Sequence, residues 1–540
     1  MTRSKLISLS VLSGFLLIPA WSMIGTGLLL LFALIPLLFV EDYFQENKHE
    51  HRSYKVFLYS YLTFLIWNIG TTFWLLNATL FGILAITINS LLMSIIFWLF
   101  HITHRNTNSV VGYIALIAFW LVFEHFYTHG EISWPWLNLG NGFAKDIYLI
   151  QWYEFTGSFG GTFWVLLTNV LGYNILKRYF RQGNLKGMLP GAGILLSVIL
   201  LPIIISLIIY STYNEKNDPR EIVVLQPNID PYLEKFGGME MSQQMDILLE
   251  LADSLTTLET DYIVAPETFI HDDIWERDLP TDPSINRISD YLLNNYCQAA
   301  FIVGLHYQKL YPSTDDKSKT AQEVPGTGTY FDSYNAAIQI DTSGILQIYN
   351  KSKLVFAVES MPYVEYLGFL RKFTIRLGGT LRSHVAQDRR ENFYNCNDST
   401  GISPVICYES IYGEYLTDYI KLGSDFIFVI TNDGWWGNTP GYRQHHSYAR
   451  LRAIETRRSV VHSANTGISS LINQRGDIIQ RTNYWERAAI RGSLNANDKL
   501  TFYTRRGDYI STIAYLLSLL NILYTGRRII IRKMPHLFGA

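Results

Sequence analysis

Eight long apolar runs are the feature of this sequence that most constrains its fold. Each is close to the roughly 20 apolar residues that cross the hydrocarbon core of a bilayer as a helix. We predict spanning helices near residues 6–20, 22–40, 55–76, 79–101, 109–127, 156–175, 189–211 and 507–524. A chain that must keep this many apolar runs away from water is organised around a membrane.

The first run has two interpretations. It follows Arg3 and Lys5 and ends in small residues near Ala20, which is the pattern of a cleaved signal peptide. A second apolar run follows at once, and this favours an uncleaved helical hairpin.

Charged residues are distributed unevenly along the chain. Residues 1–212 contain 19 Lys, Arg, Asp and Glu residues, whereas residues 213–540 contain 71, so only the second segment resembles a water-exposed domain in composition. With 49% hydrophobic residues and a net charge of −2, the chain does not have the composition of a disordered protein. The same balance argues against a nucleic-acid partner, which requires a strongly basic face.

Basic residues lie in alternate connections between the predicted helices. They are Arg3, Lys5, Lys48, Arg52, Lys55, Arg105, Lys177, Arg178, Arg181, Lys186, Arg527, Arg528, Arg532 and Lys533. Because Lys and Arg are retained on the cytoplasmic side, eight crossings place both termini in the cytoplasm. Residues 213–506 then lie on the opposite side, which in a bacterium is the periplasmic side of the inner membrane.

The segment 213–506 has the pattern of an α/β domain, because short β-rich runs alternate with helical patterns. The predicted strands include 221–225, 262–265, 300–303, 336–340, 405–407, 426–430 and 459–463, and the predicted helices are 241–256, 283–299, 412–422 and 444–457. The sequence contains no Gly-rich phosphate motif and no zinc-type pair of Cys or His residues. We therefore expect neither a cofactor nor a metal.

Three reactive side chains stand at strand ends. Glu267 follows the strand 262–265, Lys351 follows a strand at 345–348, and Cys407 ends the strand 405–407. Alone, each has a commoner structural explanation, such as a solvated loop residue or, for a free Cys, simple packing. Together they provide a reaction, because a thiol needs a base or a cation to become thiolate. Its attack on a carbonyl creates an oxyanion, which the Lys351 ammonium and the backbone N–H after Cys407 can stabilise.

The motifs around these residues resemble a known family. They are Pro266-Glu267-Thr268, Tyr349-Asn350-Lys351 with Leu354, and Ile406-Cys407-Tyr408-Glu409, and further matches lie at 134–140, 226–229, 431–437, 444–455 and 464–467. In this order they resemble the Glu-Lys-Cys triad of the nitrilase superfamily. With the eight apolar runs, the chain is similar over nearly its whole length to the membrane-embedded branch, the apolipoprotein N-acyltransferase family.

The resemblance implies a multi-helix transmembrane domain plus an outer nitrilase-like α-β-β-α sandwich. Residues 1–212 would form the first seven helices, 213–506 the periplasmic catalytic domain, and 507–540 the last helix and a basic cytoplasmic tail. It implies that Cys407 is the acylated nucleophile, Glu267 the base and Lys351 the stabiliser of the tetrahedral intermediate. The implied partners are a phospholipid acyl donor and the diacylglyceryl-cysteine of an apolipoprotein as acceptor, with no cofactor.

The resemblance also gives weight to supporting positions. These are Glu359, Tyr408 and Glu409. The sequence departs from the family where the usual Pro-Phe-Gly-Glu stretch is replaced by residues 356–359, which read Phe-Ala-Val-Glu. It departs again where an aromatic residue is usual in the first outer loop, because Lys235 aligns there with Phe236 next to it, and we assign the aromatic role to Phe236.

Residues 354–378 are too apolar for an exposed loop. We predict a lid at the membrane surface, in which Phe356, Met361 and Phe369 contact acyl chains and neighbouring basic residues lie near lipid phosphates. An ordinary packed helix is the alternative.

Two other functions stay open. A membrane-anchored nitrilase-like amidase would use water as its second nucleophile, and it would keep turnover on small soluble amides without its helical front. A transporter with an outer domain is less consistent with the sequence, because transporters place ionisable residues inside their spans and Glu124 and Asp508 are the only acids within the predicted runs. Whether Cys297 and Cys396 pair is also open.

The charge pattern makes a prediction about topology. A reporter fused after Asn214 should lie outside the cytoplasm and one fused at Lys186 inside it, because the basic loops are retained in the cytoplasm. Paired alkaline phosphatase and fluorescent protein fusions measure this. The opposite compartment at either point would overturn the assignment of residues 213–506 to the outer face.

Overall fold

The chain forms two compact units. The computed structural model describes residues 1–80, 82–130, 133–183, 188–311, 317–318, 320–355, 358–359 and 384–533. One unit, the helical unit, contains residues 1–76, 82–212 and 506–540, and the other, the sheet unit, contains residues 77–81 and 213–505. The short helices α5 (Leu75–Ala78) and α16 (Phe502–Arg506) include points at which the chain passes between the units.

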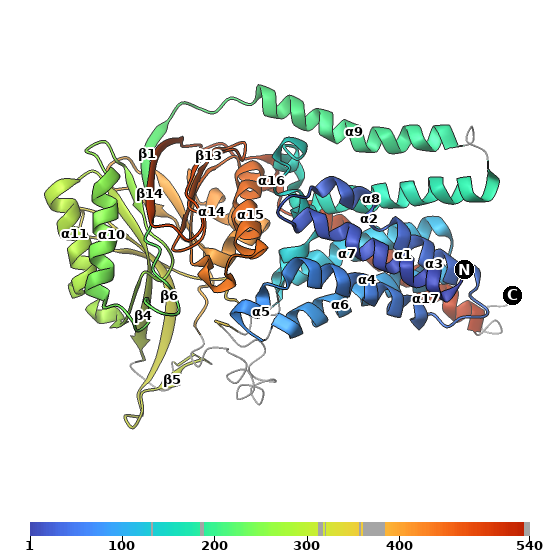
Figure 1. Cartoon of the computed structure of the whole chain (residues 1–540), viewed down its shortest axis with the longest axis horizontal. Coiled ribbons are helices and arrows are strands. Elements are labelled where there is room, and N and C mark those ends of the chain that lie inside the picture. The colour runs from blue at the N-terminus through green and yellow to red at the C-terminus, as the bar shows by residue number, and fades with distance from the viewer. Residues whose placement is uncertain are drawn as a thin grey trace. The chain divides into compact units, whose positions relative to one another are not determined.

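Each of the eight predicted apolar runs falls on helix in the helical unit (Figure 1). The helices are α1 (Arg3–Leu17), α2 (Leu30–Ala33), α3 (Ile35–Glu46), α4 (Tyr54–Thr72), α6 (Gly82–Asn106), α7 (Ser109–His129), α8 (Tyr153–Gln182), α9 (Leu189–Thr212) and α17 (Tyr509–Lys533). Among the described residues, seven helical segments are long and apolar enough to cross a membrane, and α4 is not one of them.

Polar side chains explain the lower apolarity of α4. This helix packs against both α1 and α6. Its Thr63 hydroxyl donates to the Ser10 carbonyl of α1 at 2.9 Å, and its Asn68 side-chain oxygen accepts from the Asn89 amide of α6 at 2.7 Å. Hydrogen bonds between helices satisfy polar groups that lipid cannot satisfy, so α4 is suited to a position inside the helix bundle.

A buried carboxylate joins α7 to the segment that precedes α8. Glu124 is 2% exposed and accepts hydrogen bonds from Trp120 Nε1 at 3.0 Å, from the Leu139 backbone N–H at 2.8 Å and from Thr162 Oγ1 at 2.6 Å. An ionisable residue in a spanning helix is expensive unless it is paired. Three donors from three segments stabilise Glu124 there.

The second spanning segment extends further than the sequence predicts. It runs to Glu46 and therefore contains Glu41, which is 1% exposed. The Glu41 carboxylate lies 2.6 Å from His101 Nδ1 and 3.1 Å from His104 Nδ1. The expectation that Glu124 and Asp508 are the only acids within the spans is therefore wrong. The sequence prediction ended the second span before Glu41, because a charged residue interrupts the apolar run. In the fold, two histidines on α6 lie against this carboxylate, and the helix continues past it.

Two β-sheets form the centre of the sheet unit. The first runs in the order β14-β1-β2-β4-β6-β5, with β3 beside β4 and β7 beside β6, and the second in the order β13-β12-β11-β10-β9-β8. The strands are β1 (Pro219–Gln226), β2 (Tyr262–Val264), β3 (Ile270–Trp275), β4 (Ala300–Leu310), β5 (Gln322–Glu323), β6 (Tyr330–Ile340), β7 (Gln347–Asn350), β8 (Phe393–Tyr394), β9 (Gly401–Ile406), β10 (Phe426–Thr431), β11 (Ser459–Ala464), β12 (Ser470–Ile472), β13 (Ile478–Arg481) and β14 (Ala488–Asn495).

The two sheets pack face to face between two layers of helices. Ser463 of β11 donates to the Leu225 carbonyl of β1 at 3.0 Å, and the rings of Tyr262 and Phe428 meet edge to face across the same interface. Helices α10 (Met241–Leu255) and α11 (Pro283–Asn295) pack against the first sheet, and α14 (Gly413–Lys421) and α15 (Pro440–Thr456) against the second (Figure 1). The predicted α-β-β-α sandwich is confirmed.

Candidate active site

Cys407 lies at a sharp turn that ends the strand β9, which lies between β10 and β8 in the second sheet. The strand stops at Ile406, one residue earlier than predicted, and a 3₁₀ turn, η10 (Cys407–Ile411), begins at the cysteine. The backbone of Cys407 has φ +49°, in the left-handed region that residues other than glycine rarely occupy. Backbone strain of this kind is held in place only by surrounding contacts and is concentrated at functional sites.

A buried ion cluster holds the two other predicted catalytic residues together. Lys351 is 1% exposed, and its Nζ lies 2.9 Å from Glu267 Oε1 and 2.9 Å from Glu359 Oε1. The side-chain amide of Asn335 donates to the same two oxygens at 2.8 and 2.9 Å. One ammonium therefore lies between two carboxylates that come from distant parts of the chain.

The charges in this cluster stabilise one another. Burial disfavours the Lys351 ammonium, but the carboxylates of Glu267 and Glu359 outweigh it and raise the pKa of Lys351 well above its usual value. Burial also opposes the Glu359 carboxylate, yet the positive charge of Lys351 and a hydrogen bond from the Val355 backbone N–H hold the pKa of Glu359 below its usual value. The lysine therefore stays charged at neutral pH.

The surroundings of the Cys407 thiol favour its uncharged form, whereas those of Lys351 and Glu359 favour the charged form. Burial, followed by the negative charge of Glu267, raises its pKa well above the usual value, and the positive charge of Lys351 only partly opposes this rise. The thiol is therefore protonated at neutral pH. A nucleophilic role for this sulfur would therefore need a base that removes the proton, and Glu267 is near enough to influence the thiol.

Glu409 connects the cysteine turn to the lysine loop. Its carboxylate is 0% exposed. One oxygen accepts hydrogen bonds from the hydroxyls of Tyr349 and Tyr415, at 2.8 and 2.6 Å, and from the backbone N–H groups of Ser352 and Lys353, at 2.7 and 3.2 Å. Burial raises the pKa of Glu409, and these hydrogen bonds oppose the rise. This side chain fixes the loop after Lys351 against the turn that carries Cys407.

A histidine–aspartate pair holds the same turn from the other side. His445 lies with Nδ1 3.0 Å from Asp433 Oδ1 and with Nε2 3.1 Å from the Cys407 carbonyl oxygen. Both ring nitrogens face acceptors, and although burial opposes it, the charge of Asp433 raises the pKa of His445. The sequence prediction did not assign these two residues. Their signal was available, because both lie in motifs, 431–437 and 444–455, that match the family.

The residues around Asp433 also contain a possible metal-ligand set. Asp433, His445 and His462 place one ligand atom each within 4.8 Å of one another. However, the hydrogen bonds of His445 occupy both its nitrogens, and His462 Nδ1 lies 2.9 Å from the Ile468 carbonyl oxygen. Burial lowers the pKa of His462 to about 4, so His462 is neutral at pH 7, whereas the pKa of His445 is shifted in the opposite direction. Hydrogen bonds thus account for His445 and for one nitrogen of His462, whereas His462 Nε2 and Asp433 Oδ2 are buried without a hydrogen-bond partner among the described residues.

Lys235 is a second residue near the site that the sequence prediction left without a role. It is 1% exposed, and its Nζ donates to the Glu267 carbonyl oxygen at 3.2 Å and to Thr268 Oγ1 at 3.1 Å. Burial lowers the pKa of Lys235 to about 7, although the negative charge of Glu267 opposes the shift. The lysine that replaces the family's aromatic residue thus points inward and supports the loop that carries the predicted base.

Phe236, to which we assigned the aromatic role, lies on the surface of the sheet unit. Its side chain is 53% exposed. Its ring stacks with Trp435 at a centroid distance of 6.1 Å and meets the edge of His271 at 4.9 Å. Trp435 lies in the predicted motif 431–437, so the ring of Phe236 packs against this motif.

Three sets of residues from the sequence analysis remain: Tyr408, the lid residues and two cysteines. Tyr408 is 4% exposed and packs edge to face against Tyr412 at 5.4 Å. The three lid residues Phe356, Met361 and Phe369 lie outside the residues that the structure describes. Cys297 and Cys396 are exposed free thiols.

Two family models match the chain. The carbon-nitrogen hydrolase model matches residues 224–498, which is more than half of the sequence and includes all the site residues described above. The chain belongs to the carbon-nitrogen hydrolase family. A second model, the apolipoprotein N-acyltransferase N-terminal domain, matches residues 13–171 in the helical unit.

Curated relatives match along nearly the whole chain. The apolipoprotein N-acyltransferase of Chlorobaculum tepidum is 26% identical over 520 residues, covering 94% of each protein. The apolipoprotein N-acyltransferase of Thermotoga maritima is 26% identical over 532 residues, covering 96% of this chain and 94% of the relative. Among solved structures, Saccharomyces cerevisiae Nit3, a member of the nitrilase superfamily, aligns with a TM-score of 0.36 and 13% identity, covering 54% of this chain and 93% of Nit3. With its apolar helices, the chain is a multi-pass bacterial membrane protein.

The contacts of Glu409 predict a structural effect. Glu409→Gln replaces one carboxylate oxygen with an NH₂ group, so at least one of its buried donors loses its partner. An unsatisfied buried donor costs about 1–3 kcal/mol, and we expect a lower melting temperature of the detergent-solubilised full chain in scanning fluorimetry. Glu250→Gln, at an exposed position on α10, is the matched control. Equal melting temperatures for the two variants would contradict the proposed tie between the two loops.

Proposed function

We propose that the chain is an apolipoprotein N-acyltransferase. It takes an acyl chain from a phospholipid onto Cys407 and passes it to the α-amino group of a diacylglyceryl-cysteine. The observation that supports this chemistry is the meeting of the buried Glu267–Lys351 pair with the protonated Cys407 thiol. The match to acyltransferase relatives over the helical unit as well as the sheet unit favours this function over a soluble-type amidase.

In the first half-reaction, Glu267 takes the proton from the Cys407 thiol as the sulfur attacks the ester carbonyl of the phospholipid. A C–S bond forms and the carbonyl oxygen becomes an oxyanion. The Lys351 ammonium and the backbone N–H of Tyr408 stabilise its charge. The intermediate collapses with loss of the lysophospholipid alkoxide, which takes the proton from Glu267, and the acyl group remains on sulfur as a thioester.

In the second half-reaction, the α-amino group of the acceptor attacks the thioester. The same two donors stabilise the second tetrahedral intermediate, and Glu267 takes a proton from the attacking amine. The C–S bond breaks, an amide is formed, and the thiolate of Cys407 recovers its proton from Glu267. Two reactions in sequence through a covalent intermediate predict ping-pong kinetics.

The supporting residues act through the triad. Glu359 keeps the Lys351 ammonium charged and fixed, and Glu409 keeps the lysine loop against the cysteine turn. His445 and Asp433 hold the strained backbone of the cysteine. A positioned ammonium needs no reorganisation when the oxyanion appears, which is how electrostatic preorganisation lowers a barrier.

The proposed location follows from the charge pattern and the substrates. The protein lies in the inner membrane, and the catalytic domain, residues 213–506, is periplasmic. Apolar residues of the predicted lid and the exposed ring of Phe236 contact acyl chains of the donor or acceptor. An exposed aromatic side chain at a membrane surface lies among lipids more favourably than in water.

The two-step mechanism predicts that variants of the triad fail at different points. Cys407→Ala forms no thioester. Glu267→Gln acylates about 10²- to 10⁴-fold more slowly because it lacks the base, whereas Lys351→Met slows both acylation and amine transfer. Intact-protein mass spectrometry after incubation with phospholipid alone measures the long-chain adduct on Cys407.

The pH dependence separates the base from the oxyanion stabiliser. Glu267→Gln removes a negative charge that raises the pKa of Cys407, so this pKa falls and alkaline pH partly restores acylation by ionising the thiol. Lys351→Met removes a positive charge that lowers the same pKa, and its defect in oxyanion stabilisation persists at alkaline pH.

Wild-type N-acylation by Cys407→Ala in a lipoprotein gel-shift assay would refute the triad and the proposed function.

The lid makes a separate prediction about donor length. If Phe356, Met361 and Phe369 contact acyl chains, a Phe369→Gln change should reduce use of long-chain phospholipids about ten-fold or more, because burying an aromatic side chain is worth about 1.5–3 kcal/mol. Use of short soluble esters should be nearly unchanged. Leu258→Gln, at an exposed position of the sheet unit, is the control. Equal loss on both donors would favour the packed helix over the lid.

A further inference from the structure

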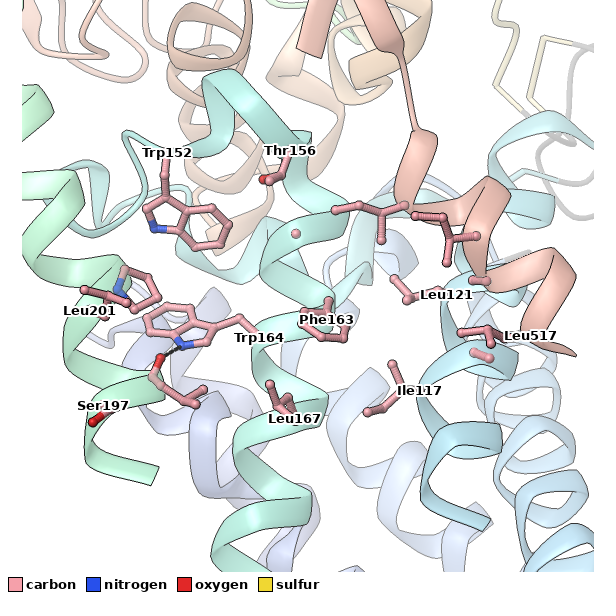
Figure 2. A pocket seen from close by; sticks show the side chains of 17 residues that line it. Ile117, Leu121, Trp152, Thr156, Phe163, Trp164, Leu167, Ser197, Leu201 and Leu517 are labelled. Carbon is pink, nitrogen blue, oxygen red and sulfur yellow. Dashed lines mark hydrogen bonds between the residues drawn. The ribbon is translucent and has the colours of Figure 1, made fainter. Parts of the chain in front are cut away.

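Two adjacent cavities lie between α8 and α9 in the helical unit. The larger, of about 680 Å³, is lined by side chains of α7, α8, α9 and α17, among them Phe163, Trp164, Leu167, Ser197 and Leu201 (Figure 2). The smaller, of about 410 Å³, lies further toward the end of α8. Leu171 and Ile194 of the smaller cavity lie about one helical turn from Leu167 and Ser197, so the two cavities follow one another along the same pair of helices. We call them the α8–α9 cavities.

A polar contact joins α8 to α9. Pro202 lies within α9 and has no N–H to donate to the Val198 carbonyl one turn earlier. The indole Nε1 of Trp164 donates to this carbonyl instead, at 2.8 Å (Figure 2). Elsewhere α9 packs loosely, with 6% of its most apolar window buried.

The larger cavity has the lining of an acyl-chain site. Apart from Thr156 and Ser197, its side chains have no hydroxyl or charged group, and the Ser197 hydroxyl already donates to the Gly193 carbonyl of its own helix. A buried water needs two to four polar partners, which this lining does not offer. Its volume lies within the range of small-ligand sites, about 300–1,000 Å³, and its walls are helices that span the membrane.

The smaller cavity has the charge of a headgroup site. Lys177, Arg178 and Arg181 line it together with apolar residues of both helices. Lys177 is bound to Asp42 and Arg181 to Glu46. Among the residues that the structure describes, Arg178 forms no ion pair. Basic pockets between spanning helices bind anionic lipid headgroups, and one uncompensated guanidinium is available here for a phosphate.

We propose that the α8–α9 cavities bind one anionic phospholipid. Its phosphate lies at Arg178, and an acyl chain extends along α8 past Leu167 and Trp164 into the larger cavity. The charge at one end and the apolar lining of the rest match the two parts of this molecule. The lining residues Leu201, Ile513 and Leu517 are also exposed on the surface of α9 and α17. The site is separate from the acyl transfer proposed above, and the bound lipid is not consumed.

The headgroup is tested by native mass spectrometry of the delipidated full chain in detergent. Phosphatidylglycerol and phosphatidylethanolamine with identical acyl chains are the probes. We expect one phosphatidylglycerol per chain and about five-fold weaker binding to Arg178→Gln, from about 1 kcal/mol per basic residue at the surface. Arg527→Gln, an exposed basic residue of α17 outside the cavities, should bind as the wild type does. Equal effects of the two variants, or no preference between the lipids, would overturn the proposal.

The acyl-chain part is tested by filling the larger cavity. Phosphatidylglycerol should raise the melting temperature of the wild-type chain, because a ligand that binds only the folded state stabilises it. Ser197→Phe should remove this rise, and Leu196→Phe, an exposed neighbour outside the lining, should retain it. An undiminished rise in Ser197→Phe, or an equal rise produced by water-soluble glycerol 3-phosphate, would overturn the acyl-chain assignment. If Ser197→Phe does not fold, the comparison of phosphatidylglycerol with glycerol 3-phosphate on the wild-type chain still tests the acyl-chain assignment.

Discussion

The buried ammonium of Lys351 between Glu267 and Glu359 is the interaction on which the site depends. Taking charged groups out of water is expensive, and removing one partner of a buried ion pair leaves an uncompensated charge. Here the ammonium donates to two carboxylates, and the side-chain amide of Asn335 donates to the same two carboxylates. The strand ends that carry these groups must therefore meet in one arrangement, and this requirement fixes the loop after β7 against the end of β2.

That cluster also acts on Cys407, the proposed nucleophile. Burial and the negative charge of Glu267 keep the Cys407 thiol protonated, and the positive charge of Lys351 only partly opposes them. A protonated thiol is a poor nucleophile and a poor target for oxidants. In the proposed mechanism, the sulfur becomes reactive only when a carbonyl is in place and Glu267 takes the proton during the attack.

In the helical unit, too, buried polar and charged groups have partners within the protein. Glu124 accepts three hydrogen bonds, Glu41 lies against two histidines, and the Val198 carbonyl freed by Pro202 receives the indole N–H of Trp164. Water cannot satisfy these groups in the bilayer core, so the protein does. The polar contacts inside this unit are compensations that let buried charges and a helix-interior proline persist.

The sequence alone determined the helices, most strands of the sandwich and the three residues that meet at the site. Helices and strands follow from apolar periodicity, which is local. The strands β3, β5, β8, β12, β13 and β14 were not predicted, because their burial alternates weakly or their segments are short. Only the tertiary structure decided that Lys235 points inward, that Glu41 is buried in a span, and that His445 holds the cysteine turn. Each of these three features depends on residues that are distant in the sequence and meet in the fold. A buried charged or polar group needs a partner, and the sequence does not show which residue that partner is.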